Sequence, residues 1–358
     1  MKKIIFFSKD LNIGGMEKSL VILLNELVKS YNVTLVLENR TGVLLKKLDK
    51  NIVVKEFKIS KNKNALIRKF QNGFRRLNWW VKNNKKYDFA CNYSTYSFWG
   101  SRLSQIASLN NALYVHSNYV QMFNKRNDVI DFFENHRINK FRKIIFVSNE
   151  SKRDMDIIFP KLSNNFVVIN NLFDYQNVLN LSTNKISHFD KKYINFIFLG
   201  RLENESKNID LLLKSFKEVV HKNPYYRLYL IGDGPYFNIS KEFILKNKLE
   251  NNIFLLLAKE NPYPYLMESD CLILTSNYEG FPVVYLEALI LNKQIMTTIP
   301  VSCPYINISD YVIKIENNIN SVIDGILHFK KKKIQYKIDF DKINKNEIND
   351  LKLIIEGR

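Results

Sequence analysis

The sequence predicts an α/β protein built from two doubly wound domains. Short β-rich runs alternate with helical stretches along the chain, the pattern of βαβ units and a mostly parallel sheet. One polar segment divides these runs into two series. The length of 358 residues also exceeds what one hydrophobic core usually serves. We therefore expect a separate sheet in each half.

The expected strands are short apolar runs bounded by turn residues. The first series lies at residues 4–7, 33–37, 52–56, 89–92, 112–115, 144–147 and 167–169. The second lies at 194–199, 227–231, 253–256, 271–274, 294–297 and 311–314. The segment 170–192 is polar, rich in Asn and Ser, and lacks a clear period, so we expect it to connect the domains. This places the N-terminal domain at 1–175 and the C-terminal domain at 190–338.

A pair of glycines follows the first expected strand. Gly14 and Gly15 precede a helical stretch over residues 18–29. Glycines at this point allow positive φ and a close approach of backbone N–H groups to a phosphate. An ordinary strand-to-helix turn is the alternative. The third glycine of the dinucleotide-binding fingerprint is absent.

Two carboxylates eight residues apart mark the C-terminal half. Glu279 precedes the turn Gly280-Phe281-Pro282, and Glu287 lies in the apolar helical stretch that opens at Val283. In an open α/β sheet ligands bind at such a strand-to-helix edge, and the helix N-terminus suits an anion. A carboxylate among apolar neighbours is costly unless it is hydrogen-bonded, for example by a sugar hydroxyl. The alternatives are a helix-capping acid at Glu279 and a buried ion pair at Glu287.

Three further polar residues follow expected strands. Arg201 and Lys207 come after the strand that ends before Gly200, and His116 follows the strand at 112–115. Two cations at a strand end can stabilise charge on a phosphate leaving group. Solvated surface cations and a structural histidine are the alternative interpretations.

Taken in order, these motifs resemble those of the retaining, nucleotide-sugar-dependent glycosyltransferases of group 1 (family 4), which have the GT-B fold. The matching blocks are Gly14-Gly15-Met16-Glu17, Leu199-Gly200-Arg201-Leu202 with Lys207-Asn208, Leu230-Ile231-Gly232-Asp233-Gly234-Pro235, and the pair Glu279 and Glu287. The resemblance implies that the last helix, within residues 339–358, crosses back onto the N-terminal domain.

The resemblance also implies roles for these residues. Arg201 and Lys207 would contact the diphosphate, Glu279 the donor sugar, and Glu287 the ribose. His116 would position the donor and stabilise charge. The backbone of Gly280, Phe281, Pro282 and Val283, with the Gly14 and Gly15 loop, would approach the sugar and the phosphates.

The same resemblance implies a nucleotide-diphosphate sugar as substrate, with no cofactor and no metal. The leaving phosphate oxygen would itself take the acceptor proton. We expect transfer to a growing glycan, with a lipid-linked acceptor in capsule, teichoic acid or lipopolysaccharide assembly. A GT-B nucleotide-sugar epimerase and a non-catalytic glycosyltransferase-like subunit are the alternatives.

The net charge of +19 is unevenly distributed along the sequence. Residues 61–86 carry nine Lys or Arg residues and no Asp or Glu. Helical spacing puts five apolar residues of this segment on one face: Leu66, Phe70, Phe74, Leu77 and Val81. Such a helix can lie on an anionic membrane surface. The alternative is that the apolar face packs on the N-terminal sheet. Nucleic acid is not expected as a partner, because no recognition motif is visible.

The cellular location is predicted from what the sequence lacks. Its three cysteines, Cys91, Cys271 and Cys303, have neither metal-site nor disulfide-framework spacing. The first apolar run is too short for a signal-peptide core. We therefore expect a cytoplasmic protein, peripheral on the inner face of the cell membrane.

Overall fold

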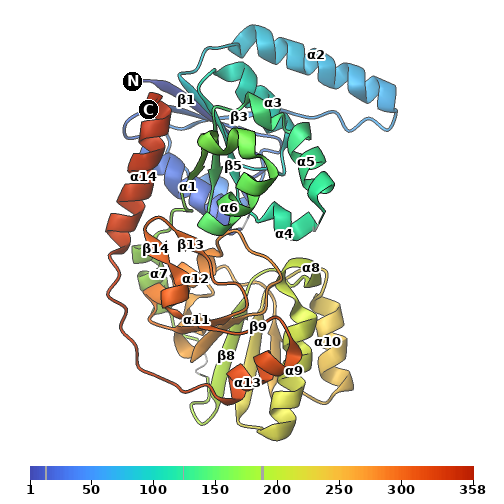
Figure 1. Cartoon of the computed structure of the whole chain (residues 1–358), viewed down its shortest axis with the longest axis vertical. Helices are drawn as coiled ribbons and strands as arrows, with labels where there is room; N and C mark the ends of the chain where they lie inside the picture. The colour runs from blue at the N-terminus through green and yellow to red at the C-terminus, as the bar shows by residue number, and fades with distance from the viewer. Residues whose placement is uncertain (13, 124, 187–188) are drawn as a thin grey trace. The chain divides into compact units, whose positions relative to one another are not determined.

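The computed structural model describes residues 1–12, 14–123, 125–186 and 189–358. The chain divides into two compact units (Figure 1). Unit 1 comprises Met1–Phe173, Cys303–Tyr305 and Asp341–Arg358, and unit 2 comprises Asp174–Ser302 and Ile306–Phe340. The division between residues 173 and 174 falls inside the segment expected to connect the domains. Of that segment, residues 187–188 lie outside the described residues.

Unit 1 contains a seven-stranded parallel sheet in the order β3-β2-β1-β4-β5-β6-β7. Its strands are β1 (Lys3–Ser8), β2 (Asn32–Leu37), β3 (Val53–Glu56), β4 (Phe89–Asn92), β5 (Asn111–Val115), β6 (Lys143–Phe146) and β7 (Phe166–Val168). The order runs outward from β1 to β3 on one side and from β4 to β7 on the other. The strand order therefore reverses between β1 and β4.

The helices of unit 1 connect these strands and cover the sheet. They are α1 (Gly15–Leu27), α2 (Ala65–Asn83), α3 (Phe98–Ala107), α4 (Tyr119–Phe123), α5 (Arg126–Asn135) and α6 (Asn149–Ile158). The last helix, α14 (Phe340–Glu356), contributes residues from Asp341 onward to unit 1. Asn110 of unit 1 donates hydrogen bonds to the carbonyls of Ile354 and Ile355 on this helix, at 3.0 Å each.

Unit 2 contains a six-stranded parallel sheet in the order β10-β9-β8-β11-β12-β15. Its strands are β8 (Ile194–Leu199), β9 (Tyr226–Ile231), β10 (Ile253–Leu256), β11 (Cys271–Leu274), β12 (Gln294–Thr297) and β15 (Val312–Lys314). Its helices are α7 (Tyr175–Ser182), α8 (Asn204–Lys207), α9 (Ile209–Lys222), α10 (Phe237–Lys246), α11 (Tyr263–Glu268), α12 (Val283–Ile290) and α13 (Ile319–Leu327). Here the strand order reverses between β8 and β11.

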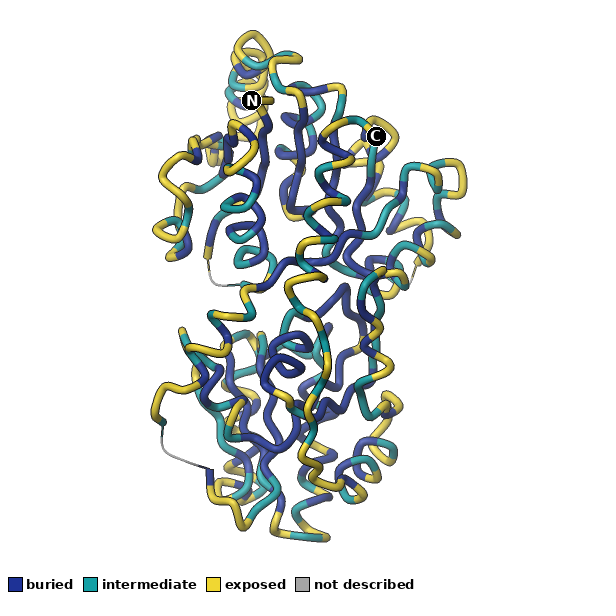
Figure 2. The backbone as a smooth tube through the Cα atoms, turned by 90° about the vertical axis from the view of Figure 1, so that its left-hand side faces the viewer, coloured by how far each residue is buried: buried dark blue, intermediate teal, exposed yellow. Residues whose placement is uncertain are grey.

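The two doubly wound sheets confirm the predicted fold class. Each of the thirteen runs expected to be strands forms one, with ends shifted by no more than one residue. These runs are apolar because parallel strands covered on both faces are buried on both faces. β4, β5 and β11 are buried along their whole length, and Figure 2 shows buried backbone in dark blue through the interior of each unit. The two-residue strands β13 (Ser302–Cys303) and β14 (Ile306–Asn307) were not predicted, since they are too short to show a period.

Helix α2 contradicts one of the two interpretations of the basic segment. Its apolar face does not pack on the sheet: Leu66 is 79% exposed, Phe70 78% and Phe74 66%. The side that faces the protein instead carries Asn72 and Trp79, the buried residues of this helix. The side chain of Trp79 packs edge-on against Phe7 and Phe57, with ring centroids 5.8 and 5.9 Å apart.

We expect Trp79→Ala to lower the free energy of unfolding by about 3–5 kcal/mol, because it removes a buried aromatic side chain and leaves a cavity. The adjacent Trp80 is 49% exposed, so Trp80→Ala is the matched control and should stay within about 0.5 kcal/mol of the wild type. Denaturant unfolding of both variants measures the difference. Equal destabilisation by the two substitutions would contradict the observed orientation of α2.

Candidate functional site

The candidate site in unit 2 lies where the strand order reverses. Strands β8 and β11 pair directly, and the chain leaves their carboxyl ends in opposite directions. In open α/β sheets this is the place where ligands bind. The loop after β8 (residues 200–208) and the loop after β11 (residues 275–282) therefore form the frame of the site.

Glycines 232 and 234 fix the path of the first loop. A Cβ atom on Gly232 would stand 1.9 Å from the carbonyl oxygen of Gly200, and one on Gly234 would stand 2.4 Å from that of Leu202. The amide of Leu202 donates to the carbonyl of Asp233 at 2.9 Å. The two turns can approach this closely because they lack side chains there. The Gly-Asp-Gly turn thus holds the loop that carries Arg201.

Hydrogen bonds join the loop after β8 to the loop after β11. The amide of Asn277 donates to the carbonyl of Ser206 at 2.8 Å, and its side chain donates to the carbonyl of Glu205 at 2.8 Å. The hydroxyl of Thr275 donates to the carbonyls of Lys207 and Asn208, at 3.3 and 3.2 Å. Thr275 and Asn277 lie between the expected strand at 271–274 and Glu279, and nothing in the sequence indicates that they would bridge the two loops.

These bonds bring Lys207 next to Glu279. The Lys207 ammonium donates to Glu279 Oε1 at 2.6 Å, and the hydroxyl of Ser276 donates to the same oxygen at 2.5 Å. The side chain of Lys207 is 20% exposed and that of Glu279 is 8% exposed. A carboxylate is thus held in place beside a half-buried cation. Such a pair can present opposite charges to different parts of one polar ligand.

Arg201 does not join this pair. Its Nε lies 3.3 Å from Glu203 Oε2, and its side chain is 67% exposed. It stays at the carboxyl end of β8, as expected, but its charge faces solvent and a neighbouring acid. Arg201 could reach a ligand only by turning away from Glu203.

Helix α12 begins directly after the turn of the second loop. Pro282 is its N-cap residue, Val283 is its first residue, and Gly280, Phe281 and Pro282 are buried. The helix is anchored by Tyr285, whose hydroxyl contacts that of Thr297 at 2.6 Å. Pro282 has no N–H to be satisfied, which suits it to this position. The first amides of α12 and the Lys207–Glu279 pair therefore flank the same short turn.

Glu287 lies on α12 and is 8% exposed. The hydroxyl of Tyr263, from α11, donates to Glu287 Oε1 at 3.1 Å. Burial and the nearby Glu287 carboxylate raise the pKa of Tyr263. Sequence reasoning foresaw that Glu287 needs a hydrogen-bond donor but did not identify this tyrosine, which lies 24 residues away in sequence.

In unit 1 the Gly14 and Gly15 pair lies at the start of α1. Gly14 is the N-cap residue and Gly15 the first helical residue. A Cβ atom on Gly14 would stand 2.1 Å from Glu17 Oε2, so the glycine makes room for that carboxylate. Burial is the largest cause that raises the pKa of Glu17. A carboxylate at the helix N-terminus is what the helix dipole favours.

His116 follows β5 in unit 1, at the same carboxyl edge as Gly14. Its Nε2 donates to the carbonyl of Tyr93 at 2.9 Å, and its ring stacks on Tyr114 at 5.2 Å and 12°. Burial lowers the pKa of His116 to about 4, so the imidazole is neutral near pH 7. Because Nε2 carries the proton, Nδ1 is a hydrogen-bond acceptor. A neutral imidazole can position a hydroxyl but supplies no net positive charge.

Two other features concern cofactors and membranes. Among the described residues, no three His, Cys, Asp or Glu side chains are grouped so that they could hold a metal ion. No helix in the described ranges is long and apolar enough to cross a membrane.

The chain matches known protein families mainly through unit 2. The model of the family "Glycosyl transferases group 1" matches residues 182–347. An uncharacterized glycosyltransferase of Methanocaldococcus jannaschii is 34% identical over an alignment of 187 positions, which covers 48% of this chain and 45% of the relative. A poly(ribitol-phosphate) alpha-N-acetylglucosaminyltransferase of Staphylococcus aureus is 28% identical over 44% of this chain and 33% of the relative. The matched region thus spans less than half of each of these relatives.

Solved structures match over nearly the whole chain. HepE from Anabaena, in complex with UDP and glucose, has a TM-score of 0.74 at 17% identity, covering 98% of this chain and 100% of that one. TarM from S. aureus, in a complex that contains UDP, has a TM-score of 0.71 at 17% identity, covering 99% and 98%. At this identity the likeness establishes the fold.

The Lys207–Glu279 contact predicts a measurable coupling. In a double-mutant cycle of Lys207→Met and Glu279→Gln, we expect an interaction free energy on the order of 1–3 kcal/mol, because both groups are mostly shielded from water. The control cycle uses the more exposed pair Lys214 and Asp210, which are 2.5 Å apart and should be almost uncoupled. Unfolding free energies provide the measurement. Coupling no larger than in the control would show that the pair is not formed in solution.

The lowered pKa of His116 predicts its titration. The ordinary pKa is 6.5 and burial lowers it to about 4. Between these values the unfolded chain binds the proton and the native protein does not, so the free energy of unfolding should fall as pH drops from 6.5 to 4. NMR titration, with the signal assigned through a His116→Gln variant, should give a midpoint near 4. A midpoint at 6 or above would contradict a neutral imidazole that is shielded from water.

Proposed function

We propose that this chain, which carries a group 1 glycosyltransferase domain in residues 182–347 and has the GT-B fold, transfers a sugar from a nucleotide-diphosphate sugar to a growing glycan. The family match confirms the resemblance found in the sequence. The observation that carries the proposal is the Lys207–Glu279 pair beside the first turn of α12, at the reversal of strand order. A cation, free helix amides and a carboxylate are the groups that a diphosphate linked to a sugar requires.

Each part of the donor is proposed to contact a different one of these groups. The diphosphate meets the Lys207 ammonium and the amides at the start of α12, with Arg201 turning from Glu203 to join them. The sugar hydroxyls donate to Glu279, and the ribose hydroxyls donate to Glu287. The buried turn at Gly280, Phe281 and Pro282 keeps the backbone close to the sugar and the phosphates. The support is that both carboxylates are buried and already oriented by hydrogen bonds.

Transfer is proposed to retain the anomeric configuration without a metal. As the glycosidic bond breaks, negative charge grows on the leaving phosphate oxygen, and Lys207 with the helix amides stabilises it. That oxygen takes the acceptor proton on the face from which the nucleotide leaves. For unit 1, we propose that the neutral His116 positions the donor through Nδ1, which accepts a hydrogen bond from a sugar hydroxyl, and that the backbone of Gly14 and Gly15 approaches the donor.

The acceptor is proposed to be a lipid-linked glycan of the cell surface, on the cytoplasmic face of the membrane. The names of three curated relatives support the coarser idea of a role in building or modifying a polymer: the S. aureus protein above, a poly(glycerol-phosphate) alpha-glucosyltransferase of Bacillus subtilis and an amylovoran biosynthesis glycosyltransferase of Erwinia amylovora. Residues matched in these relatives cover 33%, 14% and 40% of their lengths.

A thermal-shift screen of nucleotide sugars tests donor binding, because a ligand of the native state raises the apparent stability. The solved relatives with UDP make UDP-glucose and UDP-N-acetylglucosamine the first candidates. We expect Glu279→Ala to lower kcat/KM at least 100-fold, and Lys207→Ala to lower kcat more than it changes KM. A chelator should leave the rate unchanged.

The control is Lys214→Ala, at an exposed ion pair on α9. Wild-type activity of Glu279→Ala would reject the assigned site. Donor turnover without acceptor, at the full transfer rate, would indicate an epimerase instead. Absence of both binding and turnover across the nucleotide sugars would indicate a non-catalytic subunit.

A further inference from the structure

Helix α2 displays a stripe of large apolar side chains to solvent. Four residues on one face are more than half exposed: Leu66, Phe70, Phe74 and Leu77, with Val81 continuing the stripe at 62%. In Figure 1, α2 is the long helix near the N-terminus of unit 1. Soluble proteins rarely leave such a contiguous stripe uncovered unless it is an interaction surface.

The packing of α2 keeps this stripe outward. At 100° per residue, Asn72 and Trp79 lie on the side opposite Phe70 and Phe74. Asn72 Oδ1 accepts a hydrogen bond from the amide of Ser60 at 2.8 Å, and Trp79 fills the core beside Phe7 and Phe57. Turning the stripe inward would expose the tryptophan and break this bond, so the observed orientation is the stable one.

Cations border the stripe on one side. The same helical geometry places Lys69 and Arg76, with the half-exposed Trp80, along that border, while Asn78 and Gln71 follow the stripe on the other side and Lys82 lies beyond them. Residues 61–86 hold nine Lys or Arg residues and no acid. An apolar stripe bordered by cations, with a tryptophan at the boundary and no acidic residue in the segment, is the pattern of a helix that lies in the plane of a membrane.

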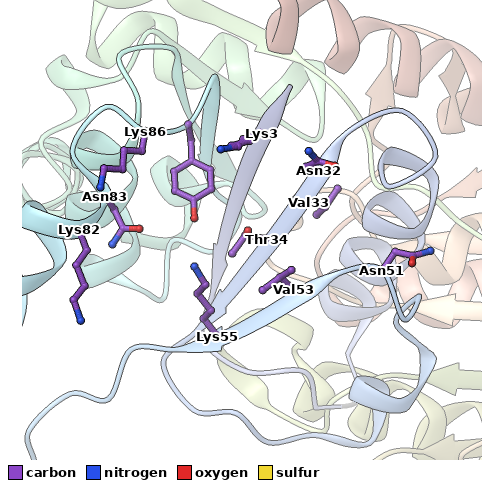
Figure 3. Close-up of a pocket in the computed structure, with 11 residues that line it drawn as sticks. Lys3, Asn32, Val33, Thr34, Asn51, Val53, Lys55, Lys82, Asn83 and Lys86 are labelled. Atoms are coloured by element: carbon purple, nitrogen blue, oxygen red, sulfur yellow. The ribbon is translucent and has the colours of Figure 1, made fainter. Parts of the chain in front are cut away.

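A lysine-rich pocket adjoins the C-terminal end of α2. It has a volume of about 430 Å³ and lies at the amino ends of β1, β2 and β3 (Figure 3). Four lysines from separate elements line it: Lys3, Lys55, Lys82 and Lys86. No Asp or Glu is among its lining residues, although the Asp88 carboxylate bonds the amide of Lys3 nearby at 2.7 Å. The pocket therefore suits an anionic group that is too large to be a simple counterion.

We propose that α2 and this pocket form a docking surface for an anionic lipid bilayer. The apolar stripe enters the boundary between head groups and acyl chains, the bordering cations meet lipid phosphates, and the lysines of the pocket add positive charge beside the C-terminal end of α2. The proposal deepens the membrane location given above and rests on it, but it does not rest on the donor chemistry of unit 2.

The charge pattern favours a bilayer over two other occupants. In a symmetric dimer the same face of both copies would meet, and the cations that border one stripe would face those of the other. A nucleic acid would pair with the cations but would leave the aliphatic Leu66, Leu77 and Val81 in water. An anionic bilayer satisfies the cations and the apolar stripe together.

Liposome flotation tests the proposal. We expect the wild-type chain to float with vesicles of phosphatidylglycerol and phosphatidylcholine, less so at high salt, and to remain unbound with phosphatidylcholine alone. Lys69→Gln/Arg76→Gln/Lys82→Gln should weaken partitioning on the order of 100-fold, at about fivefold per cation. Phe70→Ser/Phe74→Ser should weaken it by a similar factor. Binding should also shift Trp80 fluorescence to the blue, and Trp80→Phe should remove that shift.

Two matched controls keep the result interpretable. Lys222→Gln/Lys241→Gln/Lys246→Gln removes three lysines of unit 2, and Ile157→Ser/Leu109→Ser removes two exposed apolar residues of unit 1. Both controls should float like the wild type, and all variants should keep wild-type melting temperature and donor binding. Flotation unchanged by the α2 substitutions would overturn the proposal. The proposal would also be overturned if the wild-type chain did not float and ultracentrifugation showed that it forms a dimer which the α2 substitutions abolish.

Discussion

The hydrogen bonds between the loop after β8 and the loop after β11 are the constraint on which the candidate site depends. Apart from the short helix α8, neither loop is regular secondary structure, and Lys207 and Glu279, which the two loops carry, are 72 residues apart in sequence. Asn277 and Thr275 convert them into one unit by bonding backbone carbonyls of residues 205–208. Only then does an ordinary lysine become the partner of a buried glutamate. The chemistry proposed for unit 2 thus depends on hydrogen bonds to backbone carbonyls at the point where the strand order reverses.

The resting site is charge-balanced, and this shapes how a donor would enter. Lys207 and Glu279 already neutralise each other in a partly dry setting, so neither is left as an isolated buried charge. A diphosphate would draw the ammonium toward itself, and sugar hydroxyls would replace it at the carboxylate. In unit 1, the neutral His116 follows the same logic, since burial removes its charge and leaves an acceptor. In both units, therefore, these polar groups carry no net charge: Lys207 and Glu279 balance each other, and His116 is neutral.

The sequence predicted the sheets well because buried parallel strands need unbroken apolar runs, and all thirteen such runs were visible. It also placed Lys207 and Glu279 after strand ends, where topology determines the neighbourhood, and Glu287 in the helix that follows. It could not show that Tyr263 bonds Glu287, because that contact joins side chains from two separate helices. Nor could it show that Arg201 pairs with Glu203, because that contact depends on the conformation of the two side chains within one loop. For α2 the helical period was clear, but its orientation was not. Helix α2 buries the side that carries Trp79 and leaves its larger apolar face exposed, and helical periodicity alone would not indicate this orientation.

The most direct test of the central claim is a crystal structure of the chain with a bound nucleotide sugar. The account predicts diphosphate oxygens within hydrogen-bonding distance of Lys207 Nζ and of the amides that begin α12, with sugar hydroxyls on Glu279. A diphosphate held elsewhere, for example in the lysine pocket of unit 1, while the Lys207–Glu279 pair remained closed and empty of ligand, would contradict it.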